Sequence, residues 1–107
     1  MNIALDYDRT FTLMPNEWTR VIEIFRSAGA EVFCITSRFP NVPITEFPGK
    51  VHYTCGQLKW EWAHEHGLNV DIWIDDMPAC IGGPPGIEPG QAGIRRQIIK
   101  QVFDQIK

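Results

Sequence analysis

Acidic residues directly follow two apolar runs of the sequence, and they are the side chains best suited to carry chemistry. Asp6 and Asp8 come after the run NIAL, and Asp75 and Asp76 come after the run VDIWI. Carboxylates gathered at one end of a sheet repel one another unless a positive group lies between them. Hard divalent cations such as Mg²⁺ prefer oxygen ligands and are commonly held by one or two carboxylates together with a substrate phosphate. The sequence therefore predicts a metal site at these residues.

Each acidic cluster has a simpler explanation when it is taken alone, because Asp routinely ends strands and caps helices. A third apolar run, VFCI, lies between the two clusters in the sequence and ends at Thr36 and Ser37. Polar residues at the end of three separate apolar runs favour a common site over three unrelated strand ends.

The elements that must position these residues follow from the apolar pattern. Short apolar runs predict strands over residues 2–5, 32–35, 51–54 and 70–74. Helices are expected between them, and this alternation gives a parallel sheet with helices on both faces. We therefore expect a Rossmann-like α/β fold, a three-layer α/β/α domain with a small, mostly parallel sheet of about four strands. In such sheets ligands bind beyond the carboxyl ends of the strands.

Three helices are predicted from the spacing of apolar residues. The first begins with Asn16 as its N-cap and ends at Gly29. The second covers residues 57–66 and is stopped by Gly67, with Leu58, Trp62 and Trp60 on its buried side, and the third covers residues 93–106. Between the last strand and the third helix, residues 77–90 are rich in Gly and Pro and predict a long loop, which is either functional or only a connector.

Length and composition limit the kind of protein. A chain of 107 residues with 44% hydrophobic and 21% charged residues builds one core, so we expect a single domain over residues 1–107. The net charge of −3 disfavours a dedicated nucleic-acid-binding patch or adhesion to an anionic membrane. No signal-like or membrane-spanning stretch opens the sequence, and three widely spaced cysteines predict reduced, buried thiols, so a cytoplasmic location is expected.

The order of these motifs resembles the haloacid dehalogenase superfamily of phosphohydrolases. IALDYDRTFT is similar to the first motif, an apolar strand followed by DxDxT, and VFCITS is similar to the second, which ends in Thr or Ser. The third is a Lys that opens a later helix, and WIDD is similar to the fourth, an apolar strand that ends in paired Asp. The resemblance spans residues 3–76 and implies an Mg²⁺-dependent phosphatase that acts through an aspartyl-phosphate intermediate.

The resemblance also implies a role for each residue. Asp6 would be the nucleophile, and Asp8 the general acid and base. Thr36 would donate its hydroxyl to the phosphoryl group, with Ser37 as the second choice. Lys59, which lies near the start of the second helix, is favoured over Lys50 as the lysine that binds the phosphoryl oxygens.

The same resemblance assigns the metal ligands. Asp6 would bind Mg²⁺ through its second carboxylate oxygen, and Asp8 through its backbone carbonyl. Asp75 would be a direct ligand, and Asp76 would bind through water or orient the other ligands.

The chain is too short to hold the cap domain with which members of this superfamily usually select substrates. Residues 38–50, between the second and third motifs, cannot fold as a domain. The expected site is therefore open to a phosphorylated small molecule or to a phosphate on a larger one, or is closed by another subunit in a homo-oligomer.

Two other functions fit part of the pattern. A binding or regulatory protein of the same fold would keep the site without turnover. A phosphoacceptor domain of the response-regulator type is also α/β and of similar length, but in that family the acidic pair follows the first strand, and here it follows the last one.

Overall fold

The computed structural model describes residues 1–83. The predicted helix over residues 93–106 and the second half of the Gly- and Pro-rich loop lie outside the described residues. The elements in chain order are β1 (Asn2–Leu5), η1 (Phe11–Leu13), α1 (Pro15–Ser27), β2 (Glu31–Thr36), β3 (Val51–Tyr53), α2 (Lys59–Glu65), β4 (Ile72–Ile74) and η2 (Pro78–Cys80), where η denotes a single 3₁₀ turn. The four predicted strands and the two helices predicted in this part of the chain are confirmed.

The four strands form one sheet in the order β3-β2-β1-β4, and every neighbouring pair is parallel. The fold is therefore that of a small α/β domain. Because all the strands are parallel, their carboxyl ends lie at one edge of the sheet. The chain adds β2 and β3 on one side of β1 and then β4 on the other, so the direction of winding reverses between β1 and β4. This reversal is where parallel sheets of this kind commonly bind ligands.

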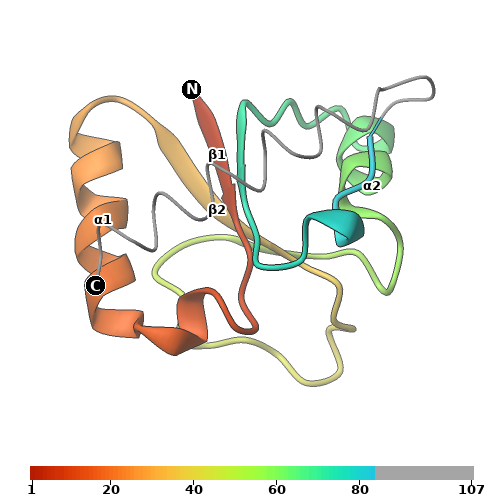
Figure 1. The fold of residues 1–107 in the computed structure, drawn as a ribbon, viewed down its shortest axis with the longest axis horizontal. Helices are drawn as coiled ribbons and strands as arrows, with labels where there is room; N and C mark the ends of the chain where they lie inside the picture. The colour runs from red at the N-terminus through yellow and green to blue at the C-terminus, as the bar shows by residue number, and fades with distance from the viewer. Residues whose placement is uncertain (84–107) are drawn as a thin grey trace.

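Two hydrophobic clusters hold the sheet to its helices, and alternate residues of β1 divide between them. Ile3 and Leu5 pack with Trp18 and Ile22 of α1, whereas Ala4 packs in the cluster that contains Ala63 of α2. Since successive side chains of a strand point to opposite faces, β1 is apolar on both faces, as its uninterrupted apolar run predicted. In Figure 1, α1 and α2 lie on opposite sides of β1 and β2.

Both helices end at the predicted glycines. Gly29 and Gly67 adopt positive φ angles of 92° and 66°. The amide that follows each glycine turns back onto the helix, because Ala30 N donates to Phe25 O at 3.0 Å and Leu68 N donates to Ala63 O at 2.8 Å. This is a Schellman ending, in which a left-handed residue that favours glycine lets the last carbonyls find donors.

The start of α1 differs from the prediction. The helix begins at Pro15, and Asn16 lies inside its first turn, so the assignment of Asn16 as the N-cap is wrong. Met14 holds the cap position without a side-chain hydrogen bond. Pro15 fits the first helical position because its fixed φ is already helical and its missing N–H would have no partner there.

The second helix is shorter than predicted, and its predicted buried side is confirmed only in part. Trp62 packs against the core as a partly buried residue, as Trp60 does. The helix spans Lys59–Glu65, and its buried residues are Lys59 and Ala63. Leu58, predicted to be buried, is exposed, because it lies before the helix with an extended ψ of 132°. The segment after β4 contributes to the core in its place, since Ile81 is fully buried in the cluster of α2 and its carbonyl accepts a hydrogen bond from Trp60 N at 2.8 Å.

None of the helices within residues 1–83 is long and apolar enough to cross a membrane. The three cysteines are unpaired, and only Cys34 is buried. Cys55 is exposed in a turn with a φ of 54°, so the prediction of a buried thiol is wrong there.

Candidate functional site

One pocket of about 440 Å³ lies at the carboxyl edge of the sheet, and every site residue predicted from the sequence lines it. These residues are Asp6, Asp8, Thr36, Ser37, Lys59, Asp75 and Asp76. They come from the ends of β1, β2 and β4 and from the start of α2. Lys50, the alternative lysine, is exposed immediately before β3 and does not line this pocket.

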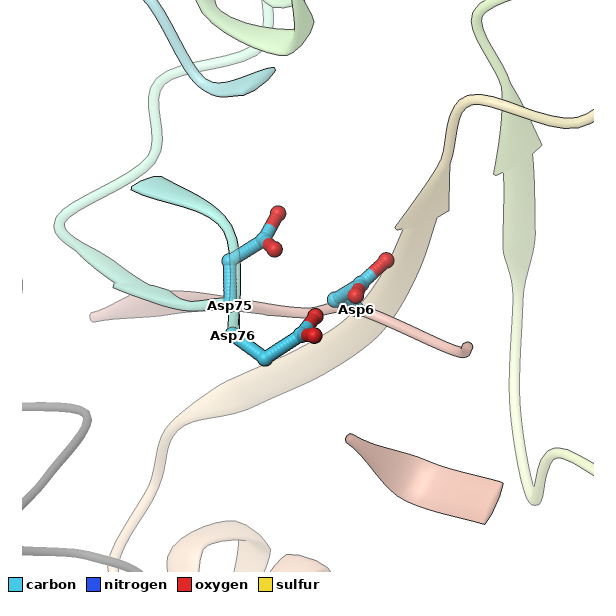
Figure 2. Close-up of side chains that lie close together, drawn as sticks. All are labelled: Asp6, Asp75 and Asp76. Atoms are coloured by element: carbon cyan, nitrogen blue, oxygen red, sulfur yellow. The ribbon is translucent and has the colours of Figure 1, made fainter. Parts of the chain in front are cut away.

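Three carboxylates gather where the direction of winding reverses. Asp6 follows β1, and Asp75 and Asp76 follow β4, its neighbour in the sheet. One carboxylate oxygen from each residue lies within 4.8 Å of the other two. Figure 2 shows the three side chains close together at the ends of their strands. The carboxylate of Asp8 is not part of this group.

The ammonium group of Lys59 bridges two of the three carboxylates. Its Nζ lies 2.7 Å from Asp6 Oδ1 and 2.5 Å from Asp75 Oδ2. The residue is only 2% exposed, and Asp6 and Asp75 are 8% and 2% exposed. An ionised lysine is almost never buried to this degree unless it is paired. The first residue of α2 is therefore held inside the protein by residues that follow β1 and β4.

Burial and the neighbouring charges both shift the pKa values of Asp6 and Lys59. The pKa of Asp6 is raised to about 7, chiefly by burial and also by the nearby Asp75, against the lowering effect of the Lys59 ammonium. The pKa of Lys59 is also raised, because its two carboxylate partners outweigh the effect of burial. An additional positive charge beside such a carboxyl group would favour its ionised form and lower its pKa.

A threonine hydroxyl and a backbone amide also contact the carboxylates of the acidic cluster. Thr10 Oγ1 lies 3.4 Å from Asp6 Oδ2 and 3.5 Å from Asp76 Oδ1, at the long end of the hydrogen-bond range. Met77 N donates to Asp75 Oδ1 at 2.9 Å. Both oxygens of Asp75 therefore have donors that fix the orientation of the carboxylate.

Thr36 and Ser37 supply hydroxyl groups from the end of β2. Thr36 is 1% exposed, and its Oγ1 accepts a hydrogen bond from Arg38 N at 3.3 Å. Within residues 1–83 the Thr36 hydroxyl donates no hydrogen bond, so its proton can be given to a ligand in the pocket. Ser37 is exposed and its backbone carbonyl accepts a hydrogen bond from Gly56 N at 2.9 Å, which ties the end of β2 to the turn after β3.

The carboxylate of Asp8 pairs with an arginine at the pocket mouth. Arg38 Nε donates to Asp8 Oδ2 at 2.8 Å, and Arg38 Nη2 donates to Asp8 Oδ1 at 2.6 Å. The guanidinium also lies over the ring of Tyr7, with its central carbon 5.2 Å from the ring centroid. Arg38 thus forms a bidentate ion pair with Asp8 and a cation–π contact with Tyr7.

Several residues of the pocket were not predicted from the sequence. They are Arg9, Arg38, Met77 and Cys80, which line it directly, and Thr10, which contacts two of its carboxylates. The position of Arg38 directly after Thr36 and Ser37 is a signal that could have identified it. Nothing in the sequence pattern pairs it with Asp8, which lies 30 residues earlier.

The acidic cluster has the charge and the atoms to hold a divalent cation. When all are ionised, Asp6, Asp75 and Asp76 carry three negative charges and Lys59 carries one positive charge, so two negative charges remain. The donors are all oxygens, which Mg²⁺ and other hard cations prefer. The donor set is therefore of the kind that hard divalent cations prefer.

Comparisons of the chain with protein-family models, with curated proteins and with solved structures found no match. The function must therefore be argued from the geometry and chemistry of the site.

Proposed function

We propose that the protein is an Mg²⁺-dependent phosphomonoester hydrolase that acts through an aspartyl-phosphate intermediate. The observation that carries the proposal is the bridge from Lys59 to Asp6 and Asp75 at the carboxyl edge of the sheet. A reactive carboxylate, a buried ammonium and further carboxylates for a cation are the groups that phosphoryl transfer requires. Their meeting at the winding reversal between β1 and β4 supports the assignment.

The residues of the pocket divide the reaction into two steps. In the first, an oxygen of Asp6 attacks phosphorus, the bond from phosphorus to the leaving oxygen breaks, and Asp8 gives its proton to that oxygen. In the second, Asp8 takes a proton from water, the water oxygen attacks phosphorus, and the bond to Asp6 breaks. Inorganic phosphate is released, and both carboxylates return to their initial states.

Other residues would hold the phosphoryl group in place. Lys59 and the Thr36 hydroxyl are donors that can neutralise and orient its oxygens. Asp6, Asp75 and Asp76, together with the backbone carbonyl of Asp8, would hold Mg²⁺. The bound ion would supply positive charge to the phosphoryl oxygens.

The fold and location form part of the same proposal. We infer a Rossmann-like three-layer α/β/α domain, supported by the parallel order β3-β2-β1-β4 and by separate hydrophobic clusters for α1 and α2. A cytoplasmic location is supported by the three unpaired cysteines.

Hydrolysis of a small aryl phosphate by the purified protein tests the function. We expect turnover that requires Mg²⁺ and is abolished by Asp6→Asn, because an amide is a poor nucleophile. Protein quenched in acid during turnover should carry a phosphoryl group on the peptide that contains Asp6. Asp71→Asn is the matched control, since Asp71 is exposed at the opposite end of β4 and contacts Asn2.

Two results would contradict the proposal in different ways. Full activity in the Asp6→Asn variant would remove Asp6 from the mechanism. Binding of phosphate with Mg²⁺ but no turnover of any phosphomonoester would favour the binding or regulatory protein described above.

A further inference from the structure

Two arginines stand at the mouth of the pocket beside the groups that the proposed reaction uses. Arg9 and Arg38 both line it, and both come from turns that follow strand ends. Arg9 adopts a φ of 60°, a left-handed conformation that is uncommon for a residue other than glycine. Its backbone N–H donates to Thr12 Oγ1 at 3.0 Å, which fixes this conformation. The turn therefore holds an arginine at the pocket despite a backbone cost.

The guanidinium of Arg38 is held in place but keeps unused donors. Asp8 accepts one hydrogen bond from Nε and one from Nη2. A guanidinium has five N–H donors, so three remain beyond those that Asp8 occupies. The stacking on Tyr7 further restricts the orientation of the group. Such a preorganised guanidinium is suited to a planar or tetrahedral anion.

Among the described residues, the charged groups of the pocket leave a positive excess at its mouth. The inner cluster of three carboxylates and Lys59 is neutral once it holds a divalent cation. At the mouth, the ionised carboxylate of Asp8 balances Arg38, and when Asp8 carries the proton that the proposed first step uses, the charge of Arg38 is left unbalanced as well. Within residues 1–83 the Arg9 side chain makes no hydrogen bond or ion pair that would balance its charge. Its positive charge is therefore available to a ligand.

We propose that the site takes phosphomonoesters that carry a second anionic group, a phosphate or a carboxylate, which Arg9 and Arg38 bind at the mouth. This inference rests on the proposed function, because the first phosphate is assigned to the inner cluster. The two arginines are binding residues and take no part in bond breaking. The net charge of −3 favours a compact ligand over a nucleic-acid strand, as does the number of arginines that line the pocket within residues 1–83, which is two.

Binding of phosphonates tests this ligand class without depending on turnover, since their carbon–phosphorus bond is not a hydrolysable ester. The probes are benzylphosphonate with a carboxylate on the ring and the same compound with a neutral carboxamide. In the presence of Mg²⁺, we expect the carboxylate compound to bind the wild-type protein about tenfold more tightly. The preference should decrease as ionic strength rises. A ring phosphonate in place of the carboxylate distinguishes which second anion is preferred.

Variants show whether the arginines cause the preference. Arg9→Gln and Arg38→Gln should each reduce the affinity ratio of the two compounds, whereas Arg20→Gln, on the exposed side of α1, should retain it. Equal affinities in the wild-type protein, no binding of either compound, or an unchanged ratio in Arg9→Gln would overturn the inference. Aryl phosphate hydrolysis measured separately tests the proposed function. A protein that turns over aryl phosphate but shows no preference would refute only the second anion site.

Discussion

Lys59 is the residue on which the arrangement of the site depends most. An ammonium group at the first position of a helix is not favoured by the helix dipole, whose positive end lies there. Its burial is accounted for by Asp6 and Asp75, which accept hydrogen bonds from it at 2.7 and 2.5 Å. The same three groups thus join α2 to β1 and β4 and form the centre of the pocket.

Replacing Lys59 should therefore destabilise the metal-free protein. Lys59→Met removes the positive charge between two buried carboxylates, and breaking such a buried pair costs about 3–5 kcal/mol. Urea unfolding at neutral pH in the absence of divalent cations would measure the loss. Lys50→Met is the control, because Lys50 is exposed and should change stability by less than about 0.5 kcal/mol. Equal effects of the two substitutions would show that the bridge contributes nothing to stability.

The raised pKa of Asp6 predicts that cation binding depends on pH. With a pKa of about 7 in the metal-free protein, against 3.8 as the ordinary value, Asp6 is mostly protonated in mildly acidic solution. A cation must displace that proton, so affinity for Mg²⁺ should rise with pH and level off above neutrality. Calorimetry in buffers of different ionisation enthalpy should detect about one proton released per ion near pH 6 and about none near pH 8.5. No proton release in mild acid would contradict the prediction.

At the scale of elements, α1 shows how a single helix covers one face of the sheet. Trp18 and Ile22 lie one turn apart and are buried against Ile3 and Leu5. Ile24, in the same helix, is 67% exposed. The contribution of an isoleucine to the stability of the fold therefore depends on whether it lies on the side of the helix that faces the sheet.

Truncation of two isoleucines of α1 tests this difference. Ile22 is 1% exposed, so Ile22→Ala should leave a cavity and cost about 2–5 kcal/mol of the free energy of unfolding. Ile24→Ala, with the same chemistry on the exposed side, should change it by no more than about 0.5 kcal/mol. Urea unfolding curves of both variants provide the comparison. Similar losses would mean that α1 does not pack as described.

At the scale of the whole molecule, the parallel sheet brings together residues that are about 70 positions apart in the chain. Asp6 N donates to Ile74 O at 2.9 Å, so the pairing of β1 with β4 continues to the edge of the pocket. Asp6 and Asp75 then follow neighbouring strands directly. A cation site formed by these two residues would therefore exist only in the folded state.

Binding of Mg²⁺ should therefore stabilise the whole fold. A ligand that binds only the folded state adds about 2.7 kcal/mol at about 100 times its Kd. Thermal unfolding should shift to higher temperature with Mg²⁺ relative to a chelator, and Asp76→Asn should reduce the shift. Asp71→Asn should retain it, because Asp71 lies at the start of β4, away from the pocket. A Mg²⁺-induced shift that survives Asp76→Asn in full would exclude Asp76 from the ion's environment.

The sequence by itself determined the strands, the helix ends at Gly29 and Gly67, and the acidic and hydroxyl residues at the strand ends that meet at the pocket. These follow from local patterns, since apolar runs form buried strands and glycine alone adopts the left-handed helix ending at little cost. Residues at the ends of parallel strands must then meet at one edge. The start of α1 was mispredicted because the preference of Pro15 for the first helical position outweighed the capping tendency of Asn16.

Only the tertiary structure decided how the charged groups of the pocket pair. Lys59 and Lys50 both lie near predicted elements. The packing of α2 against the segment at Ile81 accompanies the contact of Lys59 with Asp6, whereas Lys50 is exposed before β3. The pairing of Asp8 with Arg38 likewise depends on the turns after β1 and β2 lying side by side. Sequence patterns record which face of an element is apolar, but distances between charges on separate elements are set by how those elements pack.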